Sequence, residues 1–214
     1  MYNVCPQCGM YAVEKTVTPL NETLAQAYIT CPHCQHSVVV PYLPLFIING
    51  ASGSGKSALQ VQLMARMQKV IWLESDIFWS DLFNTPEDDY LALRSYTLRA
   101  AKNVMWSARK ALVLQGTALP HQIEANPERR YFSAVYYLTL VCDNEELARR
   151  LRARPAWRET QDEDFIQHMC AFQDWLRANA AGTNPPMTLL DNTGLSERET
   201  ADRVAAWIEA RLGD

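Results

Sequence analysis

The chain has 214 residues, of which 48% are hydrophobic and 21% charged, a balance typical of a soluble globular protein with one sizeable core and a small additional unit. A formal charge of −4 gives no general electrostatic drive toward nucleic acid or an anionic membrane. No signal-peptide pattern opens the sequence, and the longest apolar run, residues 38–48, is interrupted by Pro41 and Pro44 and is too short to cross a bilayer. We therefore expect a cytoplasmic protein with no membrane association, in which disulfides are not the use of the six cysteines.

Two Cys-Pro-x-Cys turns lie near the amino terminus, at residues 5–8 and 31–34. Zn²⁺ prefers four soft ligands in a tetrahedron, and each turn can present two thiolates from one tight loop. The pattern therefore predicts a structural zinc site made by Cys5, Cys8, Cys31 and Cys34. Two redox dithiols are the alternative interpretation.

We assign residues 1–40 to this zinc ribbon, with short strands expected at residues 11–13 and 27–30 and a turn at residues 18–22. A unit of about forty residues has too small a core to fold alone, so a bound metal would supply much of its folding free energy. Two prolines in residues 41–44 then make a short stiff connector to a second domain, residues 44–214.

The second domain opens with an apolar segment, residues 45–48, followed by Gly-Ala-Ser-Gly-Ser-Gly-Lys-Ser at residues 50–57. This sequence matches the phosphate-binding pattern G-x-x-x-x-G-K-[ST], between a strand and a helix as that motif requires. Glycines let backbone N–H groups point at a polyphosphate, and the start of a helix adds its positive dipole end. Lys56 would contact the β- and γ-phosphates, and the Ser57 hydroxyl would be a ligand of Mg²⁺. The residues predicted to bind nucleotide are Gly50, Ala51, Ser52, Gly53, Ser54, Gly55, Lys56 and Ser57.

Four further apolar strands are expected, at residues 70–73, 111–114, 135–142 and 187–191, separated by segments of helical composition. Continuous apolar strands alternating with amphipathic helices predict an α/β fold with a parallel sheet covered on both faces. In such sheets ligands bind beyond the carboxyl ends of the strands, so polar residues at those ends are the candidates for function.

Two carboxylates, Glu74 and Asp76, follow the second strand and would leave the same face if the strand continued. A carboxylate here can accept a proton from an attacking hydroxyl or hold Mg²⁺ through water. Asp76 is the stronger candidate, because residues 77–79 are apolar and could form one wall of a substrate pocket. The alternative is a solvated strand end with an aspartate helix cap. The third strand runs to Gln115 without an acid, which argues against a motor-type or AAA-type ATPase and favours small-molecule kinases.

The segment from Thr85 to Arg109 is expected to be a lid over the acceptor, where Tyr90, Arg94 and Arg99 could touch the substrate. Packing and surface roles are the alternative for these side chains. The loop at residues 116–120 is placed to contact the acceptor, and the loop at residues 191–194 to accept the nucleotide base.

Five arginines are concentrated in one short segment: Arg149, Arg150, Arg152, Arg154 and Arg158. Arginines on a mobile flap over the phosphates would neutralise charge that develops during transfer, and Arg158 is a candidate for substrate contact. Arg150 and Arg154 are four residues apart and could share a helix face. The alternative is a solvated helix face paired with nearby acids such as Glu146 and Glu163. The apolar residues that follow at helical spacing are expected to be packing rather than a binding surface: Phe165, Met169, Phe172 and Leu176.

Together, the loop at residues 50–57, the Glu-Ser-Asp strand end at 74–76, the arginine-rich segment and the Asp-Asn-Thr-Gly edge at 191–194 resemble the nucleoside and nucleotide kinase-like group of P-loop proteins. The resemblance implies a three-layer P-loop NTPase fold whose five-stranded parallel sheet has the order 2-3-1-4-5. It also implies a lid arginine that joins the loop lysine at the transferred phosphate. By this resemblance those catalytic and metal-binding roles fall to Lys56, Ser57, Asp76, Arg150 and Arg154, with the choice between the two arginines open.

The sequence thus predicts an ATP- and Mg²⁺-dependent kinase with a structural Zn²⁺, acting on a small metabolite, with nucleosides and nucleotides the favoured acceptors. Gluconate and adenylylsulfate kinases carry related loops, so the acceptor is not fixed by the resemblance. One alternative is a kinase of nucleic-acid ends recruited by the ribbon, which is disfavoured because Lys15 is the only lysine or arginine through residue 40. Another is a non-catalytic, nucleotide-sensing module whose ribbon docks a partner protein.

Overall fold

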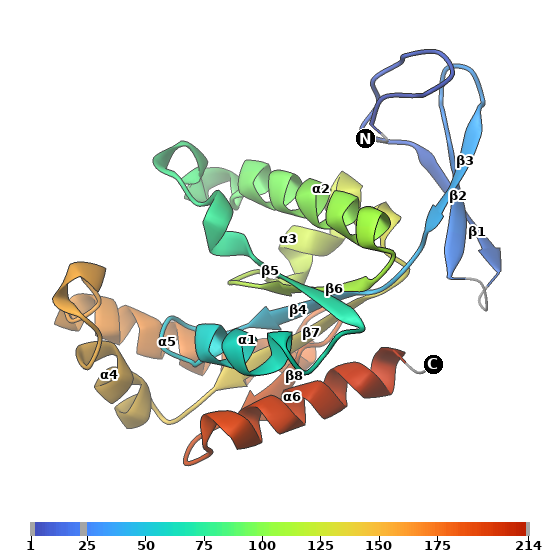
Figure 1. Cartoon of the computed structure of the whole chain (residues 1–214). Coiled ribbons are helices and arrows are strands. Elements are labelled where there is room, and N and C mark those ends of the chain that lie inside the picture. Colours follow the sequence, from blue (N-terminus) through green and yellow to red (C-terminus); the bar gives the residue numbers. More distant parts are fainter. Residues whose placement is uncertain (1–2, 22–24, 213–214) are drawn as a thin grey trace.

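The computed structural model describes residues 3–21 and 25–212, which form a small antiparallel sheet and a larger parallel one. The small sheet stands at one end of the molecule (Figure 1). Its strands pair in sequence order: β1 (Thr16–Asn21), β2 (Gln26–Thr30) and β3 (Ser37–Pro41).

The strands of this small sheet differ from those expected. Tyr11 makes only an isolated bridge with Val4, so the strand predicted at residues 11–13 is wrong and the first strand begins at Thr16. The third strand, β3, was not foreseen because it ends in Pro41; a proline is tolerated there since β3 lies at the sheet edge. The predicted turn at 18–22 ends at Glu22, outside the described residues, and its first four positions are strand.

The larger sheet is parallel throughout and has the order β5-β6-β4-β7-β8. Counted from the strand that enters the glycine-rich loop, this order is 2-3-1-4-5, which confirms the prediction. Its strands, in chain order, are β4 (Leu45–Asn49), β5 (Val70–Glu74), β6 (Ala111–Gln115), β7 (Val135–Val141) and β8 (Thr188–Asp191).

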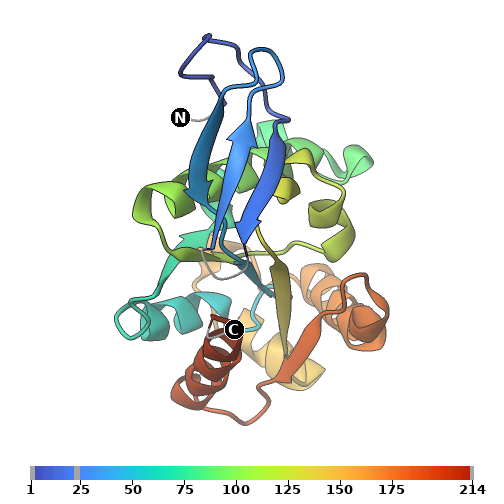
Figure 2. The same cartoon turned by 90° about the vertical axis from the view of Figure 1, so that its right-hand side faces the viewer.

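Helices cover both faces of this sheet (Figures 1 and 2), completing three layers. They are α1 (Lys56–Met64), α2 (Leu91–Ala108), α3 (Pro120–Glu124), α4 (Asn144–Arg152), α5 (Glu163–Asn179) and α6 (Glu197–Leu212). Successive residues of β4 point to opposite faces, so Ile47 joins the core beneath α2, and Phe46 joins the core beneath α1 and α6. Within the described part of the chain, no helix is long and apolar enough to cross a membrane.

The connection from β5 to α2 is irregular, and α2 begins at Leu91, within the segment 85–109 that was expected to form a lid. The connection contains three 3₁₀ helices: η2 (Ser75–Phe78), η3 (Asp81–Phe83) and η4 (Pro86–Asp88). Strand β5 ends at Glu74, so the two-residue strand period does not relate Glu74 to Asp76, which lies in η2. Both carboxylates nevertheless follow the carboxyl end of β5, beside the loop that leaves β4.

Candidate active site

Two positions of the loop between β4 and α1 have backbone conformations that favour glycine. Gly50 has a φ of +145°, and a Cβ there would lie 2.6 Å from the Leu140 carbonyl oxygen. Gly55 has a φ of +104° and stands at the N-cap of α1, without a side chain to cap the helix. The first N–H groups of α1 are thereby left to a ligand, in the arrangement that binds phosphate.

The Lys56 ammonium is turned back over this loop. Its Nζ donates hydrogen bonds to the carbonyl oxygens of Gly50, at 2.7 Å, and Ala51, at 3.1 Å. Burial lowers the pKa of Lys56 to about 8, with the carboxylate of Asp76 opposing this shift. The lysine is therefore charged at neutral pH. A bound polyphosphate would compensate for the hydration that the ammonium group loses on burial.

Hard oxygen ligands stand opposite the lysine. The Ser57 hydroxyl lies 3.4 Å from Glu74 Oε1, and Gln115 Nε2 lies 3.5 Å from the same carboxylate oxygen. Hydroxyl and carboxylate oxygens are the protein ligands that Mg²⁺ accepts, usually while keeping several waters. Ser57 and Glu74 together fit a divalent cation bound beside phosphates. Gln115 ends β6, the strand that lacks a terminal acid, and its side-chain amide orients Glu74.

A hollow of about 210 Å³ brings most of the predicted site residues together. It lies at the carboxyl ends of β4, β5 and β6, as expected for a parallel sheet. Its lining includes Ser52, Gly53, Gly55, Lys56, Ser57, Glu74, Asp76, Arg150, Arg154 and Arg158. The arginine-rich segment and the strand-end acids thus meet over the loop, although they are about 80 residues apart in sequence.

Of the five clustered arginines, Arg154 and Arg158 bring charge to the hollow without a carboxylate partner. Arg154 donates to Ser52 Oγ at 3.0 Å, and burial together with the charge of Arg158 lowers the pKa of Arg154. In residues 3–21 and 25–212, neither of the two arginines forms a salt bridge. This pair of guanidinium groups is suited to an anion between them.

The remaining arginines are paired with carboxylates. Arg149 and Arg150 both pair with Glu146 at 2.7 Å, and their hydrogen bonds lower the pKa of that carboxyl to about 2. Arg152 pairs with Glu163 at 2.8 Å. Arg149 and Arg152 are exposed, so for these two the solvated-face interpretation is correct, whereas Arg150 also lines the hollow. Helix α4 ends at Arg152, so Arg150 and Arg154 do not share a helix face.

A second hollow, of about 460 Å³, adjoins the first and shares Ser52, Lys56 and Asp76 with it. Its remaining wall combines aromatic, aliphatic and polar side chains with one arginine: Tyr90, Arg94, Thr117, Leu119, Gln122, Phe165, His168, Met169 and Phe172. Phe165, Met169 and Phe172 therefore face a cavity as well as packing, which corrects their assignment to packing alone. Gln122 and His168 were missed, because nothing in their local sequence distinguishes them from surface residues.

Besides the shared Lys56, Arg94 brings positive charge to this second hollow. It is only 7% exposed, and its Nε has no hydrogen-bond partner among the described residues. Burial lowers its pKa, with Asp89 and Asp76 opposing, and its guanidinium lies 5.8 Å from the centre of the Tyr90 ring. Trp79 contributes to a smaller adjoining hollow, while Ile77 is 64% exposed, so the predicted apolar wall is formed by Trp79.

Arg99, predicted to touch the substrate, lies elsewhere. It forms an ion pair with Glu128 at 2.9 Å and approaches the Tyr11 hydroxyl at 3.5 Å, and it lines neither hollow. Arg94 and Arg99 are separated by about 140° around the axis of α2, so they point to different surroundings.

A third hollow, of about 400 Å³, lies on the other side of the loop. Gly55 and Arg150 form part of its lining, next to Asn192 from the loop after β8. Asn192 is buried and donates to the Ser54 carbonyl oxygen at 2.9 Å, which ties this loop to the phosphate-binding loop. The predicted base-binding edge thus forms part of a cavity of suitable position for a nucleotide base.

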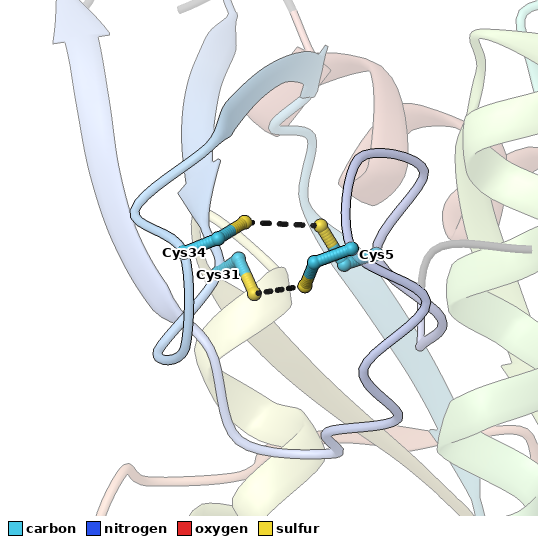
Figure 3. A group of neighbouring side chains, drawn as sticks. Cys5, Cys31 and Cys34 are labelled. Atoms are coloured by element: carbon cyan, nitrogen blue, oxygen red, sulfur yellow. Dashed lines mark hydrogen bonds between the residues drawn. The ribbon is translucent and has the colours of Figure 1, made fainter.

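The four amino-terminal cysteines converge, and Figure 3 labels three of them, Cys5, Cys31 and Cys34. The four sulfur atoms all lie within 4.8 Å of one another, with the Cys5 and Cys34 sulfurs 3.6 Å apart and the Cys8 and Cys31 sulfurs 3.8 Å apart. Cys5 and Cys31 are 2% exposed, whereas Cys34 is partly buried and Cys8 is exposed, so one side of the group faces the protein and the other faces solvent. Four convergent thiols from the two Cys-Pro-x-Cys turns, or knuckles, form a donor set that fits tetrahedral Zn²⁺.

The sheet order and the loop define a P-loop protein with the kinase-type α/β fold. Residues 47–167 match the family described as "AAA domain", and because this span exceeds half the chain, the chain belongs to that family. That the chain is not a motor-type or AAA-type ATPase stays a prediction, because the match identifies a family and not an activity. Glu74 and Asp76 at the neighbouring β5 end line the same hollow as Gln115, which ends β6 where an acid is missing.

Solved structures share this fold at low identity. A sugar kinase from a Janibacter species aligns with a TM-score of 0.54 and 18% identity, covering 79% of this chain and 95% of that one. The Deinococcus radiodurans tunicamycin resistance protein gives 0.56 and 18%, covering 78% and 95%. Thymidylate kinase from Candida albicans gives 0.52 and 14%, covering 79% and 92%. No curated protein sequence matches the chain.

Proposed function

We propose that the protein is an ATP- and Mg²⁺-dependent kinase that transfers the γ-phosphoryl group to a hydroxyl or phosphate of a small metabolite. The observation that carries this proposal is the pair of adjoining hollows that share Ser52, Lys56 and Asp76. One hollow has the features of a polyphosphate site, and the other has room for an acceptor. A group transferred between them would pass directly beside the shared lysine and aspartate.

Each residue of the shared region has a chemical task in this proposal. Lys56 and the N–H groups of the loop hold the β- and γ-phosphates, and Arg154 with Arg158 stabilises negative charge on the transferred group. Ser57 and Glu74 would hold Mg²⁺, which neutralises the phosphates when bound. Asp76, exposed at the boundary of the two hollows, orients the acceptor hydroxyl and accepts its proton.

We infer that the acceptor is a nucleoside or nucleotide in preference to other metabolites. Aromatic walls from Tyr90, Phe165 and Phe172 suit a flat ring, and Arg94 suits an anionic group. The similar solved structures include a thymidylate kinase and a sugar kinase, so sugars belong in the test as well. A nucleic-acid end recruited by the ribbon is not favoured, since Lys15, the only lysine or arginine of segment 1–40, is buried.

We further propose that residues 1–40 form a ribbon that holds structural Zn²⁺ through Cys5, Cys8, Cys31 and Cys34, and that residues 44–214 form the kinase domain. Zinc content per chain, measured by mass spectrometry of metals on the purified protein, tests the ribbon. One zinc ion is expected, with loss of the metal in Cys8→Ser and retention in Cys170→Ser, whose thiol lies outside the cluster.

The kinase proposal is tested by transfer of labelled γ-phosphate from ATP·Mg²⁺ to nucleosides, nucleotides, sugars, sugar acids and 5′-hydroxyl oligonucleotides. A labelled small-molecule product is expected with the wild type and not with Lys56→Ala. Asp76→Asn is expected to bind ATP normally and to lose turnover. Tight ATP binding with no labelled acceptor would contradict the proposal and point to a nucleotide-sensing module.

A further inference from the structure

The ribbon sheet is continuous with the hydrophobic core on one face of the parallel sheet. Ile29 and Val40, which are 2% and 3% exposed, belong to the same cluster as Leu98 and Met105 of α2. Figures 1 and 2 show the ribbon strands beside the carboxyl end of α2. The ribbon therefore packs against the helix that carries Arg94 and does not hang from a linker.

Polar contacts between the ribbon and α2 centre on a buried ion pair. Lys102 of α2 and Glu128 of the 3₁₀ helix η5 (Pro127–Tyr131) are each 1% exposed, with Lys102 Nζ 2.6 Å from Glu128 Oε2. The same Nζ donates to Asn3 Oδ1 at 2.9 Å, two residues before Cys5. Burial lowers the pKa of Lys102, and Glu128 opposes that shift. The Lys102 ammonium group thus has one hydrogen-bond partner in η5, Glu128, and one beside the first Cys-Pro-x-Cys turn, Asn3.

Tyr131 provides a second connection. Its hydroxyl donates to the Val13 carbonyl oxygen and accepts from the Lys15 N–H at 3.0 Å. Its ring centre lies 4.2 Å from the Lys102 ammonium. Residues 3–15, which carry the first cysteine knuckle, are therefore held against η5 and α2 at both ends.

The same network reaches the pocket. Asn126 accepts from the Glu128 N–H at 3.0 Å and donates to Ser95 Oγ at 2.9 Å. Ser95 adjoins Arg94, which lines the second hollow, on the amino-terminal half of α2. Lys102 and Arg94 are eight residues apart, about 12 Å along one rigid helix.

We propose that the metal-bound ribbon is a positioning element for the acceptor: it fixes segment 3–15, and through Lys102, Glu128 and Tyr131 it sets the position of α2 and Arg94. The reference to an acceptor rests on the function proposed above, whereas the coupling of the ribbon to α2 does not. Losing the metal removes the link between the two Cys-Pro-x-Cys turns, so segment 3–15 loses one of its constraints and α2 loses part of its support. ATP binding uses the loop at the carboxyl end of β4, away from the ribbon, and is independent of it.

The test is hydrogen–deuterium exchange of residues 91–108 in the full-length Cys34→Ser variant, with Cys170→Ser as the matched control. We expect amide exchange in α2 to rise about tenfold in Cys34→Ser, reflecting local opening. The KM for the acceptor should rise by a similar factor while ATP affinity stays at the wild-type value. Unchanged exchange in α2, with metal content shown to be lost, would overturn the proposal.

Tyr131→Phe keeps every cysteine and removes only the hydroxyl contacts to Val13 and Lys15, so it decides the matter if Cys34→Ser does not fold. It should retain zinc and ATP binding, yet show faster exchange in α2 and a raised acceptor KM with kcat less affected. A loss of thermal stability without these two changes would reduce Tyr131 to a structural residue and refute the coupling. If no acceptor is labelled by the wild type, the kinase proposal fails, and the exchange comparison still decides the coupling.

Discussion

Two regions of this molecule bury positive charge, and they do so in opposite ways. At the ribbon contact, Lys102 and Arg99 both bond to Glu128, so each cation has a carboxylate partner within the protein. At the loop, among the residues that the structure describes, the side chain of Lys56 bonds only to carbonyl oxygens and that of Arg154 only to a serine hydroxyl. Because an uncompensated buried charge is costly, a protein retains one where a ligand supplies the counter-charge. We therefore expect the paired region to hold the ribbon against α2, and the unpaired region to be the candidate ligand site.

The largest expected effect is at the unpaired lysine. Lys56→Ala should lower kcat/KM on the order of 10³-fold, because it removes the charge closest to the transferred phosphate. Steady-state transfer kinetics would measure the loss, with thermal denaturation to show that the fold is kept. Lys69→Ala, which changes an exposed lysine before β5, is the matched control. Equal activities of these two variants would remove Lys56 from the mechanism.

Breaking the paired region should affect folding instead. Glu128→Ala leaves Lys102 buried without its partner, so we expect the free energy of unfolding to fall by about 3–5 kcal/mol in a denaturant titration. Glu14→Ala removes the exposed partner of Arg130 and should cost about 1 kcal/mol or less. A similar small loss in both variants would mean that burial does not set the strength of the ribbon contact.

The arginine-rich segment, residues 149–158, contains arginines with and without a carboxylate partner, so the two kinds can be compared directly. Arg154→Gln should reduce kcat about 100-fold, because its guanidinium faces the hollow without a carboxylate. Arg149→Gln should leave kcat unchanged, because its exposed side chain is already paired with Glu146. Steady-state kinetics of the two variants at saturating ATP make the measurement. A larger loss in Arg149→Gln than in Arg154→Gln would reverse the assignment.

The smallest effect concerns pH. Lys56 has a pKa lowered to about 8, so it is largely charged at pH 7 and largely neutral at pH 9. ATP requires the charged form, so its affinity should fall roughly tenfold across that interval, as calorimetric titration would show. In Lys56→Arg the guanidinium stays charged, and the affinity should be flat over the same range. A flat profile in the wild type would show that the pKa of the lysine lies higher.

Short-range patterns carried much of this structure. The spacing of residues 50–57 specifies a glycine-dependent turn at the start of a helix, and both features are local consequences of the chain. The two Cys-Pro-x-Cys turns likewise prescribe pairs of thiols, and the apolar strands prescribe a sheet buried on both faces. The order of the strands came with the resemblance to P-loop kinases, and the parallel sheet has that order.

Tertiary packing decides which of the candidate side chains meet an acid or a cavity, because the sequence spacing does not determine it. Neighbouring arginines of one helix point in directions about 100° apart, so which of them meets an acid or a cavity depends on the elements packed around it. The same reason separates Arg94 from Arg99, and it turns Phe165 and Phe172 from packing residues into a pocket wall. The docking of residues 3–15 on α2 joins positions about 100 residues apart, such as Asn3 and Lys102. No local pattern encodes such a contact, because it exists only once both elements have folded against the same core.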